Sequence, residues 1–183
     1  DTSGVMVIAR NEQSMTSLGK TFHDHDIERE YVALAWGEFR EDKGTINAPI
    51  ARHPGDRKRF AVHDGGKHAV THWKVLERFG FVTLVALRLE TGRTHQIRVH
   101  LADVGHPVFG DNTYGGRMHG LARLTSFQRD LGRQLLAKLP RQALHARLLS
   151  FVHPGTKESV RFTSDLPEDM QIIVEELRRA IPN

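Results

Sequence analysis

The stretch Thr91-Gly92-Arg93-Thr94-His95-Gln96-Ile97-Arg98-Val99-His100 stands where a run of β-forming residues gives way to a helical pattern. Residues 81–90 alternate as a strand does, and Thr94 fits the N-cap of a helix over residues 95–104. Such a helix start offers free backbone N–H groups to an anion, and Arg98 can pair bidentately with a carboxylate or a phosphate. An exposed helix with ordinary polar residues explains the stretch equally well.

The elements around this stretch indicate the fold class. Residues 68–76 and 81–90 are typical of a hairpin that turns at residues 79–80. We expect further strands over residues 5–9, 30–36, 44–50, 144–152 and 159–163, and further helices capped by Asn11 and by Ser126 and beginning near residue 165. The strands dominate and show no regular alternation with helices, so the sequence predicts an α+β fold with a largely antiparallel sheet.

Composition limits the chemistry. The 183 residues, 39% of them hydrophobic, are enough for one sizeable core. The absence of cysteine excludes disulfides, thiolate metal sites and iron–sulfur clusters. His68 and His72 share one face of an expected strand but lie about 13 Å apart at about 3.3 Å per residue, so we expect no metal site there. No apolar run reaches membrane-spanning length and no leader opens the chain, so we expect a soluble cytoplasmic protein.

Positive charge is concentrated in two segments. The formal net charge is only +4, yet Arg117–Arg147 contains seven cations and one acid, and Arg52–Lys67 contains five cations. This pattern favours a positive face and an anionic partner, although a solvated basic surface remains an equal alternative.

Two interpretations of Tyr31 are open. A tyrosine at the start of a strand is commonly a core residue, and beside cations it also suits base stacking.

Three segments resemble the motifs of one family. Residues Asp1–Gly4 resemble the tail of the motif R-L-D-x-x-T-[ST]-G, residues 29–33 the second motif, and residues 92–100 the third motif of the pseudouridine synthases of the ribosomal large-subunit class. Because the motifs occur in the right order and the similarity spans the chain, residues 1–183 are expected to form the family's catalytic domain.

The resemblance implies a fold and an activity. The fold would be a mixed, mostly antiparallel sheet with flanking helices and a basic cleft. The activity would be the isomerisation of specific uridines to pseudouridine in large-subunit ribosomal RNA, in preference to transfer RNA. The reaction needs no cofactor and no metal, and no obligate protein partner or membrane is implied.

The resemblance also implies roles for individual residues. Tyr31 would stack on the flipped base and is a candidate base for the C5 proton, and Arg98 would pair with the family's catalytic aspartate. The residues expected to bind RNA are Arg52, Arg57, Lys58, Arg59, Arg93 and His95.

One departure concerns the nucleophile. In the first motif the catalytic aspartate precedes the threonine by three residues, so Thr2 places it two positions before Asp1. We therefore expect a catalytic domain truncated at its N-terminus, without the family's N-terminal RNA-binding module, and inactive as a 183-residue chain.

Overall fold

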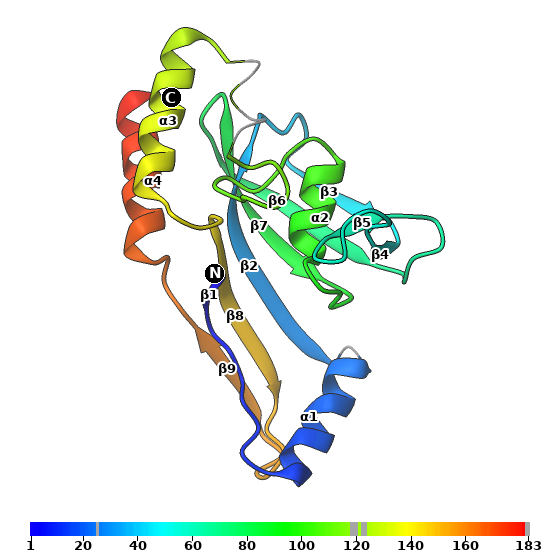
Figure 1. Cartoon of the computed structure of the whole chain (residues 1–183). Helices are drawn as coiled ribbons and strands as arrows, with labels where there is room; N and C mark the ends of the chain where they lie inside the picture. The colour runs from blue at the N-terminus through cyan, green and yellow to red at the C-terminus, as the bar shows by residue number, and fades with distance from the viewer. Residues whose placement is uncertain (25, 118–120, 122–123, 182–183) are drawn as a thin grey trace.

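A seven-stranded sheet forms the centre of the protein (Figure 1). The computed structural model describes residues 1–183 apart from 25, 118–120, 122–123 and 182–183. The strands of the sheet are β1 (Ser3–Gly4), β2 (Ile27–Trp36), β3 (Lys43–Asn47), β6 (Val70–Arg78), β7 (Val82–Leu89), β8 (Leu144–Val152) and β9 (Ser159–Thr163). Their order is β1-β8-β2-β7-β6-β3, and β9 also pairs with β8. Among the strand pairs of the described residues in this sheet, β1 and β8 run parallel and the others run antiparallel. The predicted α+β class, with a mixed and mostly antiparallel sheet, is confirmed.

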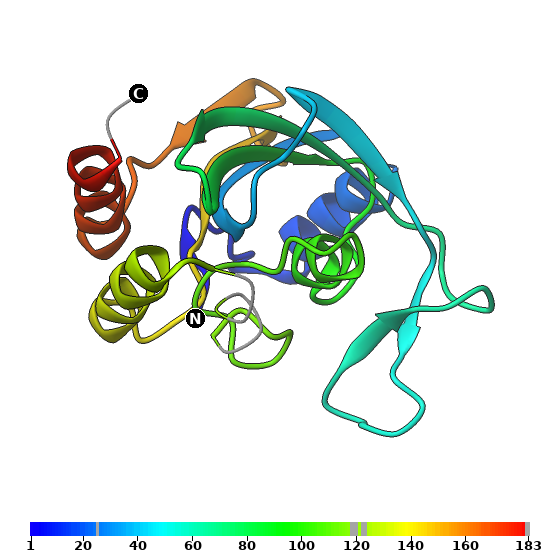
Figure 2. The same ribbon diagram turned by 90° about the horizontal axis from the view of Figure 1, so that it is seen from above.

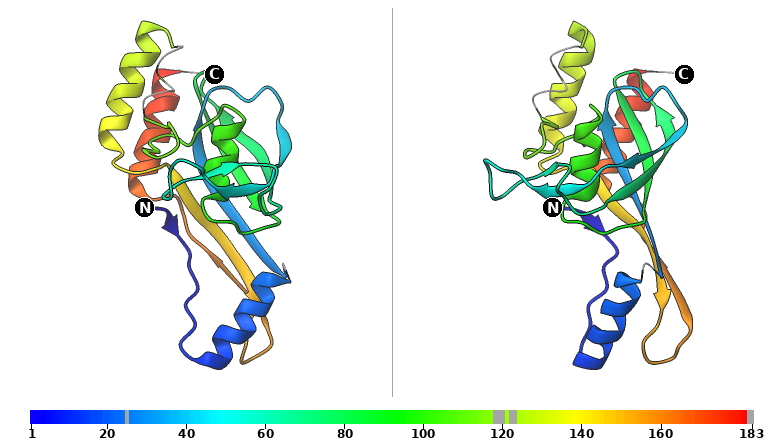
Figure 3. Two further views of the ribbon diagram at one scale, coloured as in Figure 1. Left: turned by 45° about the vertical axis from the view of Figure 1, so that its right-hand side comes forward. Right: turned by 90° about the vertical axis from the view of Figure 1, so that its right-hand side faces the viewer.

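Alternation along β2 gives the sheet two apolar faces. Val32 and Leu34 pack in one cluster with α3 (Ser126–Lys138) and α4 (Glu168–Ala180). Ala33 and Ala35 pack on the other face with α2 (Gln96–Asp103), and α1 (Glu12–His23) covers a third cluster that includes Ile27. Figure 3 shows α3 and α4 side by side, with α1 at the far end of β8. Tyr31 shares a face with Ala33, so it lies on the α2 side.

A two-stranded hairpin extends from the body of the sheet (Figure 2). It pairs β4 (Ile50–Arg52) with β5 (Phe60–Val62), and we call residues 50–67 the arm. The expected extended segment over 44–50 is thus divided between β3 and β4. None of the helices in the described part of the chain is long and apolar enough to cross a bilayer.

The expected strand over residues 5–9 is wrong. The backbone N–H of Val5 donates to the carbonyl oxygen of Ala146 at 2.9 Å, but residues 5–9 form no ladder. The reason lies in β9, which pairs with residues 148–152 and takes the edge of β8 that a longer β1 would need. Val5 and Val7 instead pack with α1.

Two helix starts differ from the expectation. The N-cap of α2 is His95 in the left-handed conformation at φ 57°, and Thr94 does not cap the helix. No side chain among the described residues caps the first turn of α2, and the side-chain oxygen of Gln96 accepts the backbone N–H of Arg93, before the helix, at 3.0 Å. At α3 the N-cap is Thr125. Its side chain accepts the backbone N–H of Gln128, and the side chain of Gln128 accepts the backbone N–H of Thr125, which forms a capping box.

Candidate active site

A cavity of about 550 Å³ lies on the α2 side of the sheet. Its walls include Asp1 and Thr2 before β1, Tyr31 on β2, and residues 95–98 at the start of α2. These positions are far apart in the sequence and belong to the three motif-like segments. The fold therefore brings all three segments to one place.

The parallel pair of β1 and β8 positions the first segment. Gly4 has a φ of 112°, and a side chain there would overlap the backbone of Ala146, so this position requires glycine. Ser3 Oγ lies 2.9 Å from Nδ1 of the buried His145, and Gln142 Nε2 donates to Thr2 Oγ1 at 3.3 Å. These contacts hold Asp1 and Thr2 at the cavity.

Tyr31 reaches the cavity from the middle of the sheet. Burial raises the pKa of its phenol, and the charge of Arg29 offsets part of this rise. The phenol is therefore protonated at neutral pH, which suits stacking and hydrogen-bond donation.

Arg98 is held by a carboxylate that the sequence analysis did not connect with it. Its Nε donates to Asp111 Oδ2 at 2.7 Å and its Nη2 to Asp111 Oδ1 at 2.8 Å. Asp111 is fully buried, and Oδ1 also accepts the backbone N–H groups of Thr113 and Tyr114. Nη1 makes no hydrogen bond to the described residues, so it is available to an acceptor in the cavity that Arg98 lines.

Tyr114 links this ion pair to the arm. Its ring centroid lies 4.9 Å from the guanidinium carbon of Arg98 and 5.5 Å from that of Arg59. Its hydroxyl accepts the backbone N–H of Phe60 at 3.0 Å and lies 2.8 Å from His95 Nδ1. Burial and then the charge of Arg98 lower the pKa of His95, so at neutral pH its ring contributes hydrogen bonds rather than charge.

The predicted RNA-binding residues occupy four places. Arg93 and His95 line the cavity, and Arg59 lies beside it against Tyr114. Arg57 and Lys58 are exposed in the loop of the arm. Arg52 lies on β4, where its guanidinium stacks 5.5 Å from the ring of Phe60 and donates to the carbonyl oxygen of Arg57.

Among the described residues, no cation of the second basic segment lines the cavity, although Gln142 and Leu144 of that segment do, and Arg141 Nη1 donates to the carbonyl oxygen of Asp1 at 3.3 Å. Arg117 donates to the carbonyl oxygens of Leu136 and Leu139, Arg141 forms a bidentate pair with Asp169, and Lys138 pairs with Glu176. These cations fix α3 and α4 to the rest of the chain. Arg123 lies outside the described residues.

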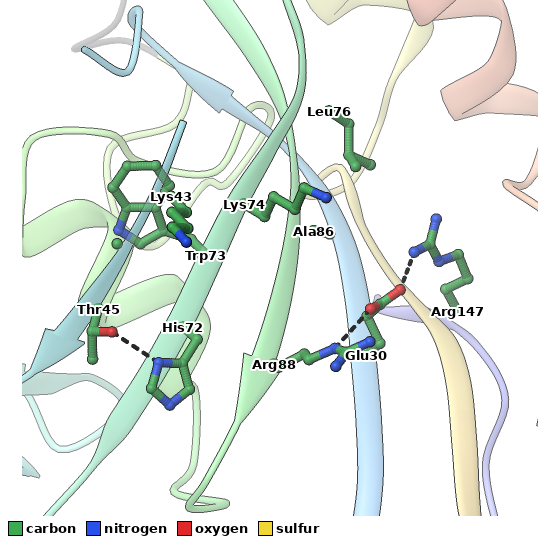
Figure 4. Close-up of a pocket in the computed structure, with 11 residues that line it drawn as sticks. Glu30, Lys43, Thr45, His72, Trp73, Lys74, Leu76, Ala86, Arg88 and Arg147 are labelled. Carbon is green, nitrogen blue, oxygen red and sulfur yellow. Dashed lines mark hydrogen bonds and ion pairs between the residues drawn. The ribbon is translucent and has the colours of Figure 1, made fainter. Parts of the chain in front are cut away.

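A second cavity, of about 740 Å³, lies on the opposite face of the sheet (Figure 4). At its edge Glu30 accepts hydrogen bonds from Arg88, at 3.0 Å, and from Arg147. None of the predicted site residues lines it. Among the described residues, no group of three or more histidines and carboxylates could hold a metal ion.

Asp111 and Tyr114 are the residues that sequence reasoning missed. Both belong to the loop of residues 105–116 and lie more than ten positions beyond Arg98. The available signal was compositional, since Gly110-Asp111 and Tyr114-Gly115-Gly116 are turn-rich segments that carry polar side chains. Only the folded loop shows that both side chains meet Arg98.

The sequence is similar to one family of known proteins. The sequence profile of the family described as RNA pseudouridylate synthase matches residues 1–103. The chain is 45% identical over 178 residues to ribosomal large subunit pseudouridine synthase D of Xanthomonas campestris, covering 97% of this chain and 52% of that protein. It is also 45% identical over 178 residues to the protein of the same name from Pasteurella multocida, covering 97% and 53%.

A solved structure shares the architecture. Human RNA pseudouridylate synthase domain containing 1 superposes with a TM-score of 0.67 at 28% identity, over 93% of this chain and 73% of that one. The chain spans about half the length of the curated relatives named above. The fold, the converging motif segments and the profile match agree, and the chain belongs to the RNA pseudouridylate synthase family.

Proposed function

We propose that the protein isomerises specific uridines to pseudouridine in RNA, with large-subunit ribosomal RNA as its substrate in preference to transfer RNA. The observation that carries this proposal is the convergence of Thr2, Tyr31 and Arg98 on one cavity. Residues 1–183 are the catalytic domain in this proposal. In this proposal the reaction takes place in the cytoplasm and requires neither a cofactor nor an obligate protein partner.

The chemistry conserves every atom of the uridine. The N1–C1′ bond breaks, the base turns, and a C5–C1′ bond forms, while the proton on C5 leaves and N1 gains one. A target base must leave the RNA stack to enter the cavity, and a protonated Tyr31 offers it a stacking surface. Arg98, fixed by Asp111, would use Nη1 to hold the nucleophilic carboxylate in its ionised form.

The nucleophile sets a condition on activity. By motif position this aspartate stands two residues before Asp1, and Asp1 itself corresponds to a variable position. We therefore propose that a 183-residue chain beginning at Asp1 binds RNA through Arg93, His95 and the arm without isomerising it.

A tritium-release assay tests the proposal. A large-subunit ribosomal RNA transcript carrying tritium at C5 of uridine is incubated with the protein as its gene encodes it, and release of tritium to water reports C5–C1′ bond formation. We expect release from this transcript and far less from transfer RNA transcripts. Binding without release would favour a non-catalytic RNA-binding protein on the same fold. Turnover by the 183-residue chain alone would overturn the assignment of the nucleophile.

A further inference from the structure

Arg29 is a buried cation that the site described above leaves unused. The residue is 9% exposed, and its Nε is buried without a hydrogen-bond partner among the described residues. No ion pair or side-chain hydrogen bond to Arg29 occurs within that part of the chain. Since an ionised group taken out of water is costly unless it is paired, such a group calls for an anion.

The neighbouring acids cannot supply that anion. Glu28 and Glu30 flank Arg29 on β2, so their side chains point to the opposite face of the sheet. There Glu28 pairs with Arg161 at 2.9 Å, and Glu30 is bound by Arg88 and Arg147. Both carboxylates are already engaged by other arginines.

Two residues, Phe22 and Gly92, lie close to the guanidinium of Arg29. The guanidinium carbon lies 5.7 Å from the ring centroid of Phe22 on α1. Gly92 also lies close to this guanidinium, since a Cβ atom at position 92 would be 2.6 Å from Arg29 Nη1. Any other residue at position 92 would push the guanidinium away, so the glycine of the third motif-like segment makes room for Arg29. Gly92 itself is exposed and precedes Arg93, which lines the cavity.

Tyr31 relates this slot to the cavity. Arg29 and Tyr31 are two residues apart on one strand and share a face, so their Cα atoms are about 6.6 Å apart. The positive charge of Arg29 also offsets part of the rise that burial causes in the pKa of the Tyr31 phenol. A nucleotide whose base stacks on Tyr31 can reach Arg29 with its own backbone.

We propose that Arg29, in the slot between Phe22 and Gly92, binds a phosphate of the RNA backbone next to the uridine that enters the cavity. This inference rests on the proposed function. It assigns Arg29 a direct substrate contact, and it gives Gly92 the role of leaving room for the guanidinium. A planar guanidinium can hold two phosphate oxygens at once, which fixes the register of the strand as well as its affinity.

The experiment compares three variants of the protein as its gene encodes it. Arg29→Met removes the charge and keeps the length of the side chain, and Arg29→Lys keeps the charge. Arg179→Met is the control, because Arg179 is an exposed cation on α4 that lies 3.7 Å from Glu175. The affinity for a large-subunit ribosomal RNA transcript is measured by fluorescence anisotropy over a range of salt concentrations, and Tm is measured for each variant without RNA.

We expect Arg29→Met to reduce the slope of log affinity against log salt by about 0.7–0.9, the contribution of one phosphate. Its Tm should be unchanged or higher, because an unpaired buried charge has been removed. Arg29→Lys and Arg179→Met should keep the slope of the natural protein. A slope that is unchanged in the Arg29→Met variant would overturn the proposal. If the slope is unchanged and the Tm is lowered, Arg29 is a packing residue and does not contact phosphate.

The tritium-release assay separates this proposal from the proposed function. If the natural protein releases tritium and the salt dependence of its RNA affinity does not depend on Arg29, the proposed function is supported and the phosphate contact is ruled out. If the natural protein releases no tritium but the salt dependence of its RNA affinity depends on Arg29, the protein binds RNA through Arg29 and is not an isomerase.

Discussion

Arg98 and Asp111 form a two-pronged ion pair at the wall of the candidate active site, with donor–acceptor distances of 2.7 and 2.8 Å. The side chain of Arg98 is 11% exposed and that of Asp111 is fully buried. Because two backbone N–H groups also bind Asp111 Oδ1, the carboxylate is fixed to its loop. The pair therefore fixes the guanidinium of Arg98, a residue that lines the cavity.

Replacing Arg98 should affect both folding and turnover. Arg98→Ala leaves a buried carboxylate without its counter-charge, so we expect it to lower the free energy of unfolding by about 3–5 kcal/mol and to reduce turnover severely. Asp111→Asn should reduce kcat on the order of a hundredfold with little change in KM, because Arg98 loses its orientation but the RNA contacts remain. Urea unfolding and tritium release measure the two effects.

A double variant separates these effects. Asp111→Asn introduced into the Arg98→Ala protein should restore part of the lost stability, because the unpaired charge is gone, and it should restore no turnover. Asp130→Asn is a matched control, since Asp130 lies 3.9 Å from Arg133 on the exposed surface of α3. It should change stability by less than about 0.5 kcal/mol. Additive losses in the double variant would show that Arg98 and Asp111 do not act as a pair.

Tyr31→Phe tests the role of the hydroxyl. Burial raises the pKa of Tyr31, so the protonated phenol dominates at neutral pH. Phenylalanine has the same ring as this form and lacks only the hydrogen-bonding hydroxyl. We expect RNA affinity within about twofold of the natural protein, because the ring surface is kept, and a kcat lowered by roughly 10²–10⁴-fold if the phenol, once deprotonated, accepts the C5 proton. An unchanged kcat would leave Tyr31 with stacking alone.

The sequence predicted the fold class and the main strands because these depend on local patterns. The strands 144–152 and 159–163 occur as expected, and the hairpin of β6 and β7 turns at Phe79-Gly80. Tyr31 and Arg98 were found from motif-like segments and do line one cavity. Each of these predictions used residues within a few positions of one another.

The rest depended on contacts between distant segments. Residues 5–9 have a strand pattern, yet β9 occupies the edge that they would need. Thr94 has the chemistry of an N-cap, but the N-cap position falls one residue later, at His95, which has the left-handed conformation and makes no side-chain capping bond. The engagement of Arg141 by Asp169 and of Arg117 by backbone carbonyls could not be read from charge counts.

The arm should contribute phosphate contacts through its exposed cations. Replacing Arg57 and Lys58 together with alanine should reduce the slope of log affinity against log salt by about 1.4–1.8, or about 0.7–0.9 for each phosphate. Stability should stay within about 0.5 kcal/mol, since both residues are exposed in a loop. Weaker binding at an unchanged slope would indicate that these residues act through the shape of the arm.

Arg59 should behave differently from its neighbours. Its Nε is buried without a hydrogen-bond partner among the described residues, and its guanidinium lies 5.5 Å from the Tyr114 ring centroid. Arg59→Met should therefore lower kcat as well as RNA affinity, because Tyr114 also packs against Arg98. Single-turnover tritium release at saturating RNA isolates kcat. A loss confined to affinity would separate Arg59 from the catalytic cluster.

The last prediction concerns Glu30 and the acid stability of the sheet. Burial raises the pKa of Glu30, and hydrogen bonds from Arg147 and Arg88 outweigh it, so the pKa in the folded protein is lowered overall. A carboxylate with a lowered folded pKa contributes stability above its unfolded pKa of about 4.3, and this contribution is lost as the pH falls through the folded value. Glu30→Gln should lower the free energy of unfolding at pH 7 by about 1–3 kcal/mol and should flatten the fall in stability below about pH 4. Glu175→Gln is the control, because its partner Arg179 is exposed, and it should leave both quantities nearly unchanged. Urea unfolding of the three proteins between neutral and acid pH provides the measurement. An equally steep acid limb in Glu30→Gln would show that other carboxylates govern the acid stability of this sheet.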